Sequence, residues 1–159
     1  MILLRMMPKC GRCVMAQENE SANIGVRHGA WGEDVAVAML RAKGYVIVSR
    51  NVRPCSWDRR LELDIVAYDR QARAIVFVEV KQHARHNEGE SRYRGIDRRK
   101  LINMRRACMA WRRSKGWSGA FRFDVVEVYG QPDDGNVPEV DHIERVALFV
   151  SSGNRVDWT

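Results

Sequence analysis

The amino-acid sequence predicts a single α/β domain in which a mixed β-sheet is flanked by α-helices. Two segments carry apolar residues at helical spacing, and four carry the alternating or continuous apolar pattern of strands. Their order is helix, three strands, helix, strand and one uncertain element. Short connections allow the first three strands to form an antiparallel meander, whereas the second helix allows a crossover to the fourth strand. With 159 residues, of which 45% are hydrophobic, the chain can bury a sizeable core.

The domain is predicted to span residues 27–150. Residues 1–26 show no sustained periodicity and are expected to be a disordered or mis-assigned extension, while residues 151–159 are expected to fray. Met15 lies in frame within the extension, so it is a second candidate for the start of translation beside the first residue. The Cys-Gly-Arg-Cys motif at 10–13 has no second close cysteine pair, so a zinc site is not expected there.

The first helix and the first strand follow from local patterns. A helix is expected over residues 28–43, because apolar residues recur there at helical spacing and Gly44 supplies a stop. Residues 45–52 alternate as a strand does, and Pro54 closes it because proline cannot continue a hydrogen-bonded ladder. Glu33 is expected in the first turn of the helix, where the helix dipole alone favours an acid.

The remaining strands surround a second helix. Residues 61–68 and 74–81 read as two strands, and the five residues between them fit a hairpin. The other elements are a helix over residues 96–113, a strand over 120–129, and an element over 142–150 that is either a strand or a short helix.

The charge of the chain points to polyanionic partners. The formal net charge is +7, the isoelectric point is about 9.6, and arginine outnumbers lysine. A basic surface favours nucleic acid or an anionic membrane, and guanidinium groups suit phosphate because they bind it in bidentate fashion. The alternative is a solvated basic surface without a partner. No run of 18 apolar residues is present, so no transmembrane helix is expected, and the protein is expected to be cytoplasmic.

The strand over residues 74–81 carries the candidate site. Its apolar run ends with Glu79 and Lys81, which leave the strand on one face because side chains two residues apart point the same way. Asp64 lies on the preceding strand, where it can come close to Glu79. Two neighbouring carboxylates need a cation, and Mg²⁺ prefers such hard oxygen ligands. A structural ion pair between Glu79 and Lys81 is the alternative, although burying such a pair gains little stability.

Asp64 followed by Glu79-Val80-Lys81 resembles the motif of the PD-(D/E)xK nucleases, the restriction-endonuclease-like superfamily. A longer series of motifs between residues 28 and 150 resembles the YraN-like family of uncharacterised bacterial proteins. The motifs are Gly32-Glu33, Gly44-Tyr45, Arg50-Asn51-Val52-Arg53, Glu62-Leu63-Asp64-Ile65-Val66-Ala67, Phe77-Val78-Glu79-Val80-Lys81, Lys100 and Arg122-Phe123-Asp124. Leu61 and His83 stand where that family usually has glycine and arginine.

The resemblance implies a restriction-endonuclease-like mixed β-sheet core flanked by α-helices, similar to that of archaeal Holliday-junction resolvases. It implies that Asp64 and Glu79 hold Mg²⁺ or Mn²⁺ and that Lys81 is the catalytic lysine. Glu33 would reach into the site from the first helix.

The second helix carries candidate nucleic-acid contacts. Arg98, Arg105 and Arg112 each belong to an arginine pair, and the pairs repeat every seven residues along one side of the helix. Lys100 matches the family pattern. These residues are candidates for binding phosphate, and a solvated face is the alternative.

The sequence thus favours a Mg²⁺-dependent endonuclease that hydrolyses phosphodiester bonds in branched or single-stranded DNA. The alternative is a non-catalytic nucleic-acid-binding protein with a nuclease-like fold that acts in DNA repair, recombination or uptake. Nucleic acid, most readily DNA, is the expected partner and a membrane is not, while a homodimer is compatible with either function.

Overall fold

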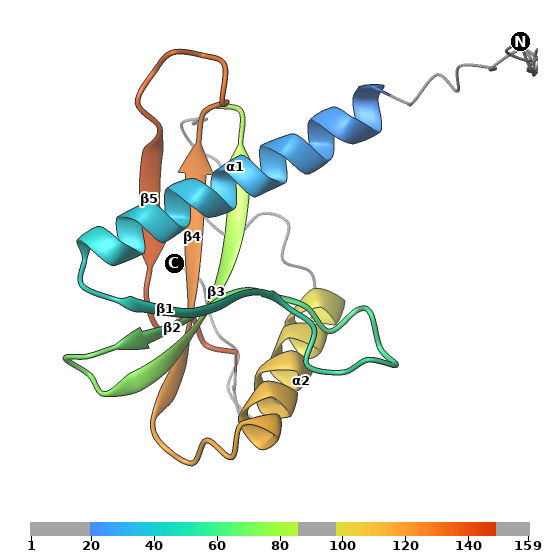
Figure 1. Cartoon of the computed structure of the whole chain (residues 1–159), viewed down its shortest axis with the longest axis vertical. Coiled ribbons are helices and arrows are strands. Elements are labelled where there is room, and N and C mark those ends of the chain that lie inside the picture. Colours follow the sequence, from blue (N-terminus) through green and yellow to red (C-terminus); the bar gives the residue numbers. More distant parts are fainter. Residues whose placement is uncertain (1–19, 86–97, 149–159) are drawn as a thin grey trace, which may run out of the picture.

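The computed structural model describes residues 20–85 and 98–148. They form two helices and one five-stranded sheet, shown in Figure 1. The elements are α1 (Glu20–Ala42), β1 (Val46–Val52), β2 (Leu63–Asp69), β3 (Ala74–His83), α2 (Arg98–Ser114), β4 (Phe121–Tyr129) and β5 (Glu139–Ile143). Neither described helix combines the length and apolar character needed to cross a membrane.

The sheet has the strand order β1-β2-β3-β4-β5 and is mixed, as predicted. The β1–β2, β2–β3 and β4–β5 pairs are antiparallel, whereas β3 and β4 run parallel. α2 lies between these two parallel strands in sequence and provides the crossover. The meander, the hairpin and the crossover expected from the sequence are therefore confirmed.

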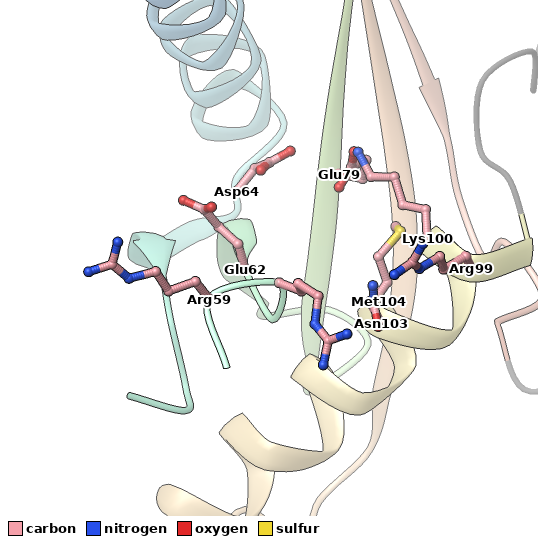
Figure 2. A pocket seen from close by; sticks show the side chains of 9 residues that line it. Arg59, Glu62, Asp64, Glu79, Arg99, Lys100, Asn103 and Met104 are labelled. Carbon is pink, nitrogen blue, oxygen red and sulfur yellow. The ribbon is translucent and has the colours of Figure 1, made fainter. Parts of the chain in front are cut away.

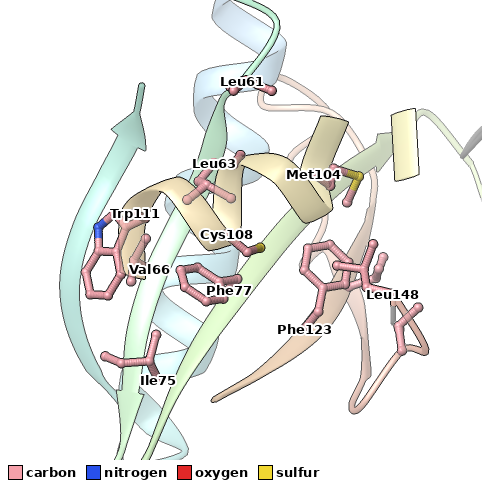
Figure 3. Close-up of a cluster of buried hydrophobic side chains, with 13 residues drawn as sticks. Leu61, Leu63, Val66, Ile75, Phe77, Met104, Cys108, Trp111, Phe123 and Leu148 are labelled. Atoms are coloured by element: carbon pink, nitrogen blue, oxygen red, sulfur yellow. The ribbon is translucent and has the colours of Figure 1, made fainter. Parts of the chain in front are cut away.

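The two helices cover opposite faces of the sheet (Figure 1). The continuous apolar run of β3 serves both faces: Val76 and Val78 pack with α1, and Phe77 packs with α2. On the α2 side, the rings of Phe77 and Trp111 meet edge to face with centroids 5.5 Å apart. Figure 3 shows this cluster, in which Met104 and Cys108 of α2 also lie over the sheet.

A buried polar network lies on the α1 face between β2, β4 and β5. Asp124 is fully buried and accepts hydrogen bonds from Arg122 Nε (3.0 Å), His142 Nε2 (3.0 Å) and the Arg145 backbone N–H (2.9 Å). Arg122 also donates to Asp69 Oδ2 (2.8 Å). The buried charges are thus paired within the network, which ties three strands together.

Two predicted boundaries were wrong. α1 begins at Glu20 rather than at residue 28, so residues 20–26 are helical and not part of an extension. The apolar period of the sequence begins later than the helix, so it does not mark the first turns of α1. The uncertain last element is the strand β5, which starts before residue 142 and ends at Ile143. Residues 1–19 and the predicted tail lie outside the described residues.

Candidate active site

Asp64 and Glu79 lie on adjacent antiparallel strands and face the same side of the sheet. Ile65 pairs with Val78, so continuing the register by one residue brings Asp64 opposite Glu79. Directly opposite residues share a face and have Cα atoms about 4.5–5.5 Å apart. The sequence prediction that these two carboxylates come together is consistent with this register.

Both carboxylates line one cavity of about 410 Å³, shown in Figure 2. The cavity opens between α2 and the segment that precedes β2. Its other polar walls are Arg59, Arg60 and Glu62 from that segment and Arg99, Lys100 and Asn103 from α2. The acids therefore lie in a concave site that is rich in cationic side chains.

Asp64 is held in place by a backbone hydrogen bond and is electrostatically perturbed. The Val80 backbone N–H donates to Asp64 Oδ2 at 2.8 Å, which fixes the carboxylate across the two strands. Burial, and then the negative charge of Glu79, raise the pKa of Asp64 to about 7. The Val80 N–H and the Lys100 ammonium oppose this shift without cancelling it. A carboxyl group poised near neutral pH in a cleft is typical of functional sites.

Glu79 is buried and lies between two lysines. Lys81 Nζ is 2.9 Å from Glu79 Oε1, and Lys100 forms a second ion pair with the same oxygen. Figure 2 shows the Lys100 side chain reaching from α2 to Glu79. Burial is the largest single influence and lowers the pKa of Lys100, but the hydrogen bonds with Glu79 and Lys81 and the negative charges of Glu79 and Asp64 together outweigh it, so the net shift of that pKa is upward. Lys100 thus belongs to the site itself, a placement that the sequence alone did not give.

Lys81 also has a second acidic neighbour. It is the register partner of Glu127 on the parallel strand β4, and Glu127 is buried. Tyr129 donates its hydroxyl hydrogen to Glu127 Oε2 at 2.8 Å. Sequence reasoning missed Glu127, because the pairing of β3 with β4 depends on the crossover and not on any local pattern.

Glu33 lies near the site, but its carboxylate is hydrogen-bonded to side chains of β1. It is deep within α1 and not in its first turn, so the helix dipole does not account for it. Its Oε2 accepts hydrogen bonds from Asn51 Nδ2 (2.9 Å) and Arg50 Nη2 (3.3 Å). Asn51 has a φ of 48°, a left-handed conformation that asparagine tolerates better than most residues. The Glu33 charge contributes weakly to the raised pKa of Asp64, so its expected approach to the site is partial.

The donor set fits a magnesium-type ion with two protein ligands. Within residues 20–85 and 98–148, no three His, Cys, Asp or Glu side chains come together as a ready metal cage. Asp64 and Glu79 supply two hard oxygen donors, and Mg²⁺ is commonly bound by one or two carboxylates plus waters and substrate phosphate. The residues present therefore fit Mg²⁺ or Mn²⁺ in the presence of substrate better than a closed structural metal site.

The sequence of this site matches a protein family. The model of the uncharacterised protein family UPF0102 matches residues 32–128. A UPF0102 protein of Mycobacterium tuberculosis is 35% identical over 124 residues, which cover 76% of this chain and 92% of the relative. One from Rhodopirellula baltica is 33% identical over 127 residues, covering 79% of this chain and 71% of the relative.

The chain belongs to UPF0102. The resemblance to YraN-like uncharacterised bacterial proteins is thereby confirmed. The segment shared with UPF0102 contains the predicted site residues Glu33, Asp64, Glu79 and Lys81, and all of the cavity described above. The family description names no activity, and placement in the restriction-endonuclease-like superfamily stays a prediction.

The predicted arginine row on α2 of this UPF0102 protein divides in the structure. Arg98 and Arg105 are exposed, as a phosphate-binding role requires. Arg112 is half-buried, and its guanidinium lies over the Phe121 ring, 3.9 Å from the centroid. This cation–π contact places the Arg112 guanidinium against Phe121, whereas Arg98 and Arg105 face solvent. A phosphate-binding role for the three arginines stays a prediction.

Proposed function

We propose that this UPF0102 protein is a Mg²⁺- or Mn²⁺-dependent endonuclease that hydrolyses phosphodiester bonds in branched or single-stranded DNA. The observation that supports this most is the placement of Asp64 and Glu79 on one sheet face, in a cavity with Lys100 and beside Lys81. Acid, acid and lysine in one cleft are the groups that metal-assisted phosphodiester hydrolysis needs.

In this proposal each side chain has a defined task. Asp64 and Glu79 would hold the ion, which when bound supplies positive charge that polarises a phosphoryl oxygen. Lys81 and Lys100, both paired with Glu79, would place their ammonium groups where negative charge develops on the phosphate. The arginines that line the cavity would position the DNA backbone.

A cleavage assay tests the proposal. Purified protein is incubated with labelled branched and single-stranded DNA in Mg²⁺, in Mn²⁺ and with a chelator. Glu79→Gln should lower the rate at least about a hundredfold, because it removes a charge that the ion requires. Asp133→Asn, on an exposed loop, is the matched control and should retain activity. Equal cleavage by wild type and Glu79→Gln would point to a contaminating nuclease and overturn the assignment.

One observation favours a second function. Glu79 is already paired with two lysines, so its charge is balanced without a metal ion. Such a site would suit a non-catalytic nucleic-acid-binding protein that acts in repair, recombination or uptake. Calorimetric titration of Mg²⁺ into the protein, with and without DNA, separates the two functions. Tight DNA binding, no heat of Mg²⁺ binding and no cleavage would together favour the binding protein.

A further inference from the structure

We propose that the groove between α2 and the β1–β2 connection binds an unpaired nucleotide whose base stacks on Trp57. This inference rests on the proposed action on nucleic acid and names the substrate class, a strand with an accessible unpaired base beside the cleavage site. The groove is separate from the cavity of Asp64 and Glu79 and has a volume of about 520 Å³.

Trp57 is an exposed aromatic residue on an anchored loop. The residue is 86% exposed, an unusual state for tryptophan, while the next residue, Asp58, is buried. Asp58 accepts hydrogen bonds from Arg60 Nε (2.8 Å) and Arg60 Nη2 (3.0 Å), and Arg106 Nη2 of α2 lies 3.5 Å away. The Arg60 bonds close the loop on itself and the Arg106 ion pair links it to α2, so the loop that carries the indole is anchored beside the groove.

The rest of the groove combines apolar and cationic side chains of α2. Ile102 and Met109 are both exposed and do not belong to the core cluster beneath α2. Arg105, Arg106 and Arg113 line the same groove. An aromatic platform beside arginines is how proteins hold single-stranded nucleic acid, because every base can stack and every phosphate can pair with a guanidinium.

The groove leads toward the catalytic cavity. The cavity is bounded by residues 99–104 of α2 and the groove by residues 102–113, and both are bounded by the β1–β2 connection. In Figure 1 this connection runs beside α2. Lys100 and Ala110 are ten residues apart, which corresponds to about 15 Å along a helix. A strand held at Trp57 can therefore continue into the cavity.

The charge of the groove argues against a second copy of this chain as its occupant. Two such grooves facing each other would bring three arginines of each copy together, within a chain of formal charge +7. Like charges at an interface disfavour association, whereas a polyanion is attracted. Nucleic acid is the occupant that matches both the aromatic and the cationic side chains.

Binding measured with a chelator present tests this inference without requiring cleavage. The probe is a fluorescent single-stranded oligonucleotide, offered as DNA and as RNA, with a blunt DNA duplex for comparison. Trp57→Ala should weaken single-strand binding by about five- to 150-fold, and leave duplex binding within about twofold. Trp57→Phe should recover much of the affinity, because a phenyl ring still stacks. Val137→Ala, at a residue exposed on another loop, is the control.

The possible outcomes separate this inference from the nuclease proposal. Loss of single-strand affinity in Trp57→Ala supports the groove even if no cleavage is ever seen. Unchanged affinity overturns it, even if Glu79→Gln abolishes cleavage. If Trp57→Ala instead converts a dimer to a monomer in light scattering, with unchanged oligonucleotide affinity, the groove is a contact between copies and the inference fails. Because Trp57 is exposed, thermal melting should show that the variant stays folded.

Discussion

Replacing Asp64 with asparagine should stabilise this protein at alkaline pH in metal-free buffer. The pKa of Asp64 is raised from 3.8 to about 7, first by burial and then by Glu79. The native state therefore holds the proton of Asp64 more tightly than the unfolded state does. Stability contributed by the protonated carboxyl is present at low pH and is lost as the pH rises from about 4 through about 7.

The size of the effect follows from the two pKa values. At 1.36 kcal/mol per pKa unit, the interval corresponds to roughly 4 kcal/mol at most. Water entering the open cavity reduces this, so the gain in free energy of unfolding at pH 8.5 should be about 2 kcal/mol. The amide oxygen of asparagine can still accept the Val80 hydrogen bond. In a chain of this length the melting temperature should rise by about 6 °C at pH 8.5 and hardly change near pH 4.

Thermal melting of wild type and Asp64→Asn with a chelator, from pH 4 to 8.5, checks this. A second series adds Mg²⁺, which should stabilise wild type by mass action and the variant much less. Asp133→Asn serves as a control, because it makes the same substitution at an exposed loop residue that does not line the cavity. A difference in melting temperature that is the same at all pH values, or a variant that is less stable at pH 8.5, would refute the raised pKa.

Three further predictions concern the rest of the fold. Arg122→Met should lower the free energy of unfolding in urea by about 3–5 kcal/mol, because it removes the guanidinium that pairs with the buried Asp124. The exposed Arg70→Met is the control, and an equal loss of stability in both variants would contradict the prediction. Burial raises the pKa of the Cys108 thiol to about 12, so at pH 8 a neutral alkylating reagent should label it only in denaturant, as judged by peptide mass spectrometry. Labelling at the same rate in the native protein would show that the helix opens there. Phe77→Ala should cost about 3–5 kcal/mol in urea unfolding, and a loss below 1 kcal/mol would mean that the α2-face core is loosely packed.

Much of the fold was predictable because it is encoded locally. β3 is a continuous apolar run in which Val76 and Phe77 serve opposite faces, and such a run identifies a central strand without any knowledge of its neighbours. The hairpin between β2 and β3 brought Asp64 to Glu79 by simple register. Elements whose limits are not marked by apolar periodicity, such as the first turns of α1, were placed less well.

The missed features of the site depend on tertiary packing. Lys100 reaches Glu79 only because α2 crosses the sheet at that level, and helix periodicity does not fix where a helix sits along a strand. Glu127 comes beside Lys81 through the parallel pairing of β3 with β4. Trp57 lies in a loop with no periodic signal, and neither its exposure nor the ion pair of Asp58 with Arg106 of α2 follows from a local pattern.

The charges around Asp64 support the proposed metal-dependent enzyme over a purely structural cluster. Glu79 has two lysines, whereas the buried Asp64 has a hydrogen bond from Val80 and a raised pKa. If the cluster served only stability, a buried carboxyl whose negative charge is only partly compensated would be a defect, because well-packed neutral groups serve stability better. A divalent ion held by Asp64 and Glu79 would remove that defect, since it would favour the ionised form of Asp64. The same ion would compete with Lys81 and Lys100 for Glu79 and free their ammonium groups to meet a phosphate. Metal binding and substrate binding should therefore be coupled, with each raising the affinity of the other.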